Sequence, residues 1–68
     1  MEPNTEVRYR AITYAGKRWP SEPTVILETD NREAAIYAAK AYKRSQVLRA
    51  DMTGVNAGTF LLDWIVNP

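Results

Sequence analysis

The segment spanning residues 28–44 constrains the fold most, because it is the one part of the chain with the pattern of a helix. Asp30 and Glu33 have the spacing of a capping box, and Thr29 is the rival N-cap, so a helix is predicted to begin here. On a helical wheel, small residues share one face with Tyr42, and this face is predicted to pack closely against a sheet. The members of the face are Ala34, Ala35, Ala38, Ala39 and Tyr42.

Four segments around this helix have the alternation or the apolar content of β-strands. They are residues 6–15 and 24–29 before the helix, and residues 46–52 and 59–66 after it. The sequence therefore predicts one α+β domain over residues 1–68, in the order β-β-α-β-β. Its four-stranded, mainly antiparallel sheet carries the helix on one face. The order of the strands in the sheet stays open, and residues 1–5 are expected to be frayed.

The segment 59–66 is the strongest of the predicted strands. Its alternation predicts that every second side chain faces the core, namely Phe60, Leu62, Trp64 and Val66. The turn before it, residues 53–58, contains two glycines and an asparagine, which suit backbone positions with positive φ.

One helix covers one face of a sheet, so the other face is expected to look outward. The side chains predicted there are apolar and cationic: Arg8, Arg10, Ile12, Tyr14, Ile26, Leu61 and Ile65. Monomers rarely leave so large a patch unused. A strand bulge that turned Ile12 and Tyr14 inward would shrink this patch.

The residue types that are missing exclude several functional classes. Without cysteine or histidine, the chain cannot form a disulfide, a thiolate zinc site, a cysteine nucleophile or the usual general base. The carboxylates of Asp30 and Glu33 are explained by the preference of a helix start for negative charge. We therefore expect no enzyme, no metal and no cofactor. A small chain without disulfides fits the cytoplasm, and the acidic, polar N-terminal residues and the short apolar runs predict no signal peptide and no membrane contact.

Aromatic and cationic side chains outside the predicted core are the candidate binding residues, because such side chains often anchor interfaces. Trp19 has two interpretations, a lid over the edge of the core or an exposed anchor. The cations after the helix also complement its dipole. The candidates are Arg8, Arg10, Tyr14, Arg18, Trp19, Tyr37, Lys40, Arg44 and Arg49.

Within residues 25–51, a strand ends in Glu28-Thr29, a helix opens with Glu33-Ala34 and carries Ala38, and Arg49 lies on the next strand. This order resembles the short phage-encoded inhibitors of bacterial RNA polymerase. In that family the strand after the helix supplies arginines to the polymerase contact, so the resemblance implies a contact role for Arg49. This chain differs by having one arginine there and a fourth strand. Small anti-CRISPR proteins are similar in size and in their mixture of strands with one helix.

Three hypotheses follow. The leading one is a small non-enzymatic inhibitor or modulator, encoded by a phage or mobile element, that occupies a surface of a host protein or ribonucleoprotein complex in the host cytoplasm. The second is a nucleic-acid-binding domain, although a formal net charge of +1 argues against it. Its contacts would be Arg8, Arg10, Lys17 and Arg18, with Tyr9, Tyr14 or Trp19 stacking on bases. The third is a structural homodimer whose exposed sheet faces pair.

Overall fold

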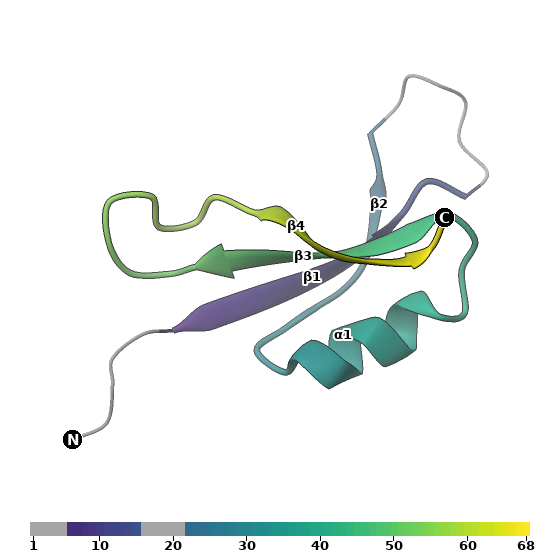
Figure 1. Cartoon of the computed structure of the whole chain (residues 1–68), viewed down its shortest axis with the longest axis horizontal. Coiled ribbons are helices and arrows are strands. Elements are labelled where there is room, and N and C mark those ends of the chain that lie inside the picture. The colour runs from purple at the N-terminus through teal and green to yellow at the C-terminus, as the bar shows by residue number, and fades with distance from the viewer. Residues whose placement is uncertain (1–5, 16–21) are drawn as a thin grey trace.

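The computed structural model describes residues 6–15 and 22–68, which form one four-stranded sheet and one helix (Figure 1). The elements are β1 (Val7–Thr13), β2 (Thr24–Thr29), α1 (Arg32–Ala39), β3 (Ser45–Asp51) and β4 (Leu61–Asn67). The strand order is β2-β1-β3-β4, and all three pairings are antiparallel. The α+β fold with one helix packed on the sheet is therefore confirmed. The predicted fraying of residues 1–5 falls outside the described residues.

The helix begins one residue later than the capping-box pattern suggests. Asn31 is the N-cap, and its side-chain oxygen accepts hydrogen bonds from the backbone N–H groups of Glu33 (3.0 Å) and Ala34 (3.1 Å). Thr29 supports the turn, because its hydroxyl accepts a bond of 3.1 Å from the Asn31 N–H. Thr29, Asp30 and Asn31 are all residue types that cap helices, and the chain adopts the backbone conformation in which Asn31 is the cap.

The helix ends at Ala39, well before the predicted end of the helical segment. Arg44 has a φ of 53°, a left-handed conformation that turns the chain into β3. Two side chains bind the carbonyl groups left free at the helix end. The Ser45 hydroxyl lies 2.7 Å from the oxygen of Ala39 and 2.9 Å from that of Tyr42, and the Asn67 amide donates to Tyr42 at 2.8 Å. The predicted packing of Tyr42 on the sheet is wrong, since it lies beyond the helix and is 43% exposed.

Small side chains form the core between helix and sheet. Ala11, Ala35, Ala39 and Val47 are all fully buried there, so the alanine face of the helix does lie against the sheet. Four larger side chains pack against this cluster while only partly buried: Tyr9, Ile26, Ile36 and Val66. Ile36 of the helix therefore also contributes to the core.

A bulge corrects the predicted outward position of Ile26. The register of β1 against β2 shifts between Ala11 and Ile12, which leaves Ile26 as the extra residue of β2. An extra residue interrupts the alternation of a strand, so Ile26 packs against the core cluster. Ile12 is only 3% exposed and Tyr14 is half-buried, so neither contributes much to an outward patch.

Two further bulges overturn the predicted orientation of β4. The register of β3 against β4 leaves Asp63 and Val66 without a partner, so strict alternation along β4 fails. Val66 packs against the core as predicted, but Leu62 and Trp64 are 55% and 53% exposed. These two side chains are not core residues.

Candidate functional site

The face of the sheet opposite α1 is the candidate site. Directly paired residues of neighbouring strands share a face, and Arg10 lies between two β1 residues that join the helix-side core. Its partners are Glu28 on β2 and Leu48 on β3, and Leu48 in turn pairs with Leu62 on β4. One row of side chains thus crosses all four strands on this face. A second row consists of Val25, Ile12, Gln46 and Ile65. We call these two rows, together with Arg8 and Phe60, the open face.

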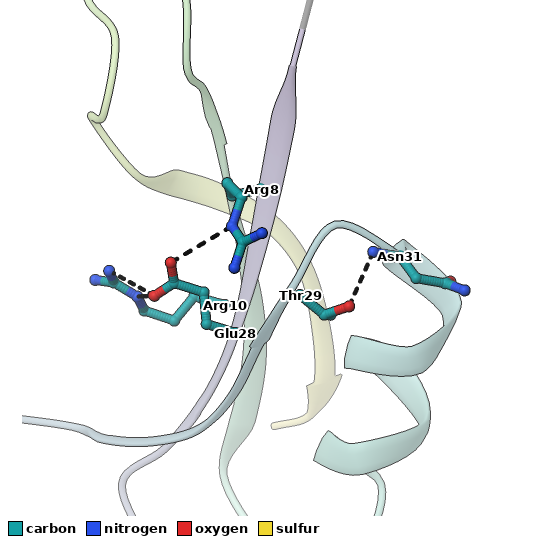
Figure 2. A network of polar contacts seen from close by, with 5 residues as sticks. All are labelled: Arg8, Arg10, Glu28, Thr29 and Asn31. Carbon is teal, nitrogen blue, oxygen red and sulfur yellow. Dashed lines mark hydrogen bonds and ion pairs between the residues drawn. The ribbon is translucent and has the colours of Figure 1, made fainter.

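The arginines of β1 converge on one carboxylate of the open face. Figure 2 shows Arg8 and Arg10 both turned toward Glu28. Arg10 donates two hydrogen bonds to one Glu28 oxygen, from Nε at 3.2 Å and Nη2 at 3.0 Å. Arg8 Nε lies 3.5 Å from the other oxygen. These side chains are between 33% and 39% exposed, so the pairs add at most about 1 kcal/mol each to stability. Their main effect is to fix the direction of the guanidinium groups.

An aromatic ring holds Arg10 from a second direction. The Arg10 guanidinium carbon lies 3.9 Å from the centre of the Phe60 ring, within the range of a cation–π contact. Phe60 comes from the segment just before β4, so this contact joins β1 to the strand that lies two places away in the sheet. Arg10 is therefore held by β2 through Glu28 and by the β4 end through Phe60.

Arg49 lies on the other side of the sheet. It pairs in register with Tyr9 and Leu61, and Tyr9 belongs to the helix-side core. Its Nη2 is 3.4 Å from Asp51, a long and exposed ion pair. Arg49 also lines a hollow of about 530 Å³ with Asp51, Asp63 and the loop that joins β3 to β4. The structure therefore separates Arg49 from Arg8 and Arg10.

The turn after the helix brings three further candidates together. Lys40 and Arg44 line a shallow hollow of about 450 Å³ with Tyr42 and Lys43. Tyr14 joins this turn through its backbone, since its N–H donates a hydrogen bond of 3.1 Å to the Arg44 carbonyl. Tyr37 stands apart on the outer surface of α1 and is 79% exposed.

Two of the predicted site residues, Arg18 and Trp19, lie outside the described residues, as does Lys17 of the nucleic-acid hypothesis. In contrast, sequence reasoning missed Glu28 and Phe60 as members of a site. The sequence marks Glu28 only as the end of the second strand, and the alternation of residues 59–66 predicts that Phe60 faces the core. The sequence does contain a signal for Glu28, because a β-hairpin between the first two strands would place its carboxylate near the arginines of β1.

The described residues contain no helix that is long and apolar enough to cross a membrane, and no group of three acidic side chains that could hold a metal. Comparison of the chain with protein-family models, curated proteins and solved structures gave no match.

Proposed function

We propose that this chain is a non-enzymatic binding protein that attaches to a macromolecular partner, in the first place a protein, through the open face of its sheet. One observation carries the proposal: Arg10 is fixed between Glu28 and Phe60 on a face that α1 does not cover. Arginine and aromatic side chains are the residues most enriched at the centres of protein interfaces.

Fixing the arginine before binding has a direct energetic consequence. An interface loses about 0.5–1.5 kcal/mol for each long side chain that it must immobilise. Glu28 and Phe60 hold Arg10 in the free protein, so much of this loss is removed in advance. The half-exposed apolar side chains Leu62 and Ile65 lie on the same face and add area that a partner can bury.

The carboxylate on the open face also favours a protein over a nucleic acid as the binding partner. Glu28 neutralises part of the charge of Arg8 and Arg10, which lowers the attraction of this face for phosphates. The guanidinium donors that remain suit carbonyl and carboxylate oxygens on a protein surface.

The test compares Arg10→Ala with Arg49→Ala, because each removes one arginine with a carboxylate partner and the two lie on opposite sides of the sheet. The immobilised chain is first used to capture partners from a bacterial lysate. The resemblance to phage inhibitors makes RNA polymerase the first purified partner to titrate. If the open face binds, Arg10→Ala lowers affinity by about 30-fold, which corresponds to about 2 kcal/mol. Arg49→Ala then leaves the affinity unchanged.

The reverse result would assign the contact to Arg49, as the resemblance implies, and would overturn the role of the open face. Tyr37→Ala belongs in the same assay, since this exposed tyrosine reports on the outer surface of the helix. Circular dichroism of each variant shows whether a loss of binding is a loss of fold.

A nucleic acid is the second candidate partner, and one observation favours it. Lys40, Lys43 and Arg44 gather in one exposed turn. If this turn binds phosphates, titration with single- and double-stranded DNA and RNA shows an affinity that falls steeply with salt. The Lys43→Ala variant then weakens binding to every sequence alike, whereas Arg10→Ala has little effect.

A further inference from the structure

The outer edge of β4 carries the largest group of exposed apolar side chains in the described part of the chain. We propose that two copies of the chain pair there, edge to edge and antiparallel, so that two four-stranded sheets join into one. The inference goes beyond the proposed function: it shares Leu62 and Ile65 with the open face, but the arginines that carry that function lie on β1, two strands from the edge.

The exposure of β4 on both of its faces points to an edge contact. Leu62 and Ile65 pair with open-face residues, whereas Leu61 and Trp64 pair with residues of the helix side. All four are half-exposed or more, at 55%, 49%, 68% and 53%. A partner lying on one face would cover only two of them. A neighbouring strand places side chains beside both faces and covers all four.

The charges of β4 permit a copy of itself to approach. Lysines, prolines and bulges are devices that block pairing at exposed edge strands; Leu61–Asn67 contains no lysine or proline, and its two bulges lie at Asp63 and Val66. Its one charged residue, Asp63, is held by Arg32 of α1 at 2.7 Å. Two copies of this strand therefore meet without an uncompensated like charge. β4 pairs with β3 and with no other strand among the described residues, so its outer backbone groups are available.

The other edge of the sheet is less suited to pairing. β2 is entered through Pro23, which lacks a backbone N–H, and it carries the charged Glu28 that the β1 arginines hold. Val25 is half-exposed and Leu27 is 37% exposed, so this edge offers less apolar surface than β4. Because the β4 edge can pair and the β2 edge cannot, two copies form a closed dimer and do not extend into a fibre.

The small size of the core explains why the partner at β4 is a second copy of this chain. The buried apolar side chains among residues 6–15 and 22–68 are four alanines, Ile12 and Val47. Domains of this length are marginal even with larger cores, and many are completed by oligomerisation. A copy of the chain is always present to complete the fold. In a two-fold pair, each exposed side chain of β4 is also buried twice, once in each copy.

The first experiment measures the purified wild-type chain alone by sedimentation velocity and by thermal melting. We expect twice the single-chain mass of 7.7 kDa and a melting temperature that rises with chain concentration over a roughly hundredfold range. A folded chain that stays at 7.7 kDa with a constant melting temperature would overturn the proposal. So would a ladder of larger assemblies, which would show that the pairing does not close.

The second experiment locates the contact. The double variant Leu61→Lys with Ile65→Lys places charge on both faces of the edge, and it should weaken the dimer by about 100-fold or more. The matched control is Val55→Lys, since Val55 is fully exposed in the loop and away from the strand. If both variants keep the wild-type mass, the contact is not at β4.

The absence of native cysteine gives a readout that does not depend on stability. A single cysteine placed at residue 62, 64 or 65 can form a disulfide only with another copy. Near a two-fold axis the two Cα atoms approach within about 4.4–6.8 Å. We expect oxidation to cross-link at least one of these variants rapidly, and Tyr37→Cys, on the helix surface, to remain uncross-linked. Equal cross-linking at residue 37, or none along β4, would overturn the edge pairing.

Discussion

The substitution Ala35→Leu tests whether the helix is held against the sheet by the absence of side-chain bulk. Ala35 is fully buried and belongs to the core cluster with Ala11, Ala39 and Val47. The substitution adds three carbon atoms within this buried cluster. If free space existed there, each added group would gain about 0.8 kcal/mol, or roughly 2.4 kcal/mol in total. If the space is filled, the helix must move or the side chain must leave its preferred rotamer, at a cost of about 1–3 kcal/mol.

We expect the second outcome, because alanines contact one another across this interface and leave little room for a branched side chain. In a domain of this length, a loss of 1–3 kcal/mol lowers the melting temperature by about 4–24 °C. The measurement is a urea or thermal unfolding curve at one fixed chain concentration, so that dimerisation does not change the comparison. Ala41→Leu is the matched control, since Ala41 is exposed after the helix and should shift stability by no more than about 0.5 kcal/mol. A gain in stability for Ala35→Leu would refute the close approach of helix and sheet.

Three further predictions concern the two ends of the helix. Asn31→Ala should lower the free energy of unfolding by about 1 kcal/mol through loss of the N-cap, and Asp30→Ala by clearly less; equal losses would contradict the assigned cap. Ser45→Ala should cost about 1–3 kcal/mol in urea unfolding, because the buried hydroxyl binds helix-end carbonyls; a neutral result would mean that water replaces it. Arg44→Gly should raise the melting temperature, since glycine relieves about 1 kcal/mol of strain at a φ of 53°, and a lower value would show that the arginine side chain stabilises the turn.

The element order was predictable because each element has a strong local signal. Alternation marked the four strands, and the alanine-rich segment between them allowed one helix. The alanines of the helix also identified its buried face, since Ala35 and Ala39 could approach the sheet where larger residues could not. Local signals were weaker at the ends of the helix, where Thr29, Asp30 and Asn31 are all good caps.

The orientation of β4 could not be predicted, because it depends on bulges that appear only when two strands are paired. Alternation assigned Leu62 and Trp64 to the core, and the unpaired Asp63 between them breaks that alternation. Arg32 accounts for part of this arrangement. Its guanidinium binds Asp63 at 2.7 Å and lies 5.7 Å from the Trp64 ring, so a charged side chain of the helix lies beside Trp64. The open face was even harder to predict from the sequence, since Arg10, Glu28 and Phe60 lie far apart in the chain.

The width of a single helix explains why β4 is left uncovered. A helix with its side chains is about 10–12 Å wide, whereas four strands span roughly 14 Å or more between the outer two. Figure 1 shows this short helix beneath one part of the sheet. The buried cluster that it forms with the sheet lies on β1 and β3, and β4 joins only through the partly buried Val66. A second helix could have covered β4 from within the chain. In the dimer that we propose, the second copy takes this role and covers β4 from outside the chain.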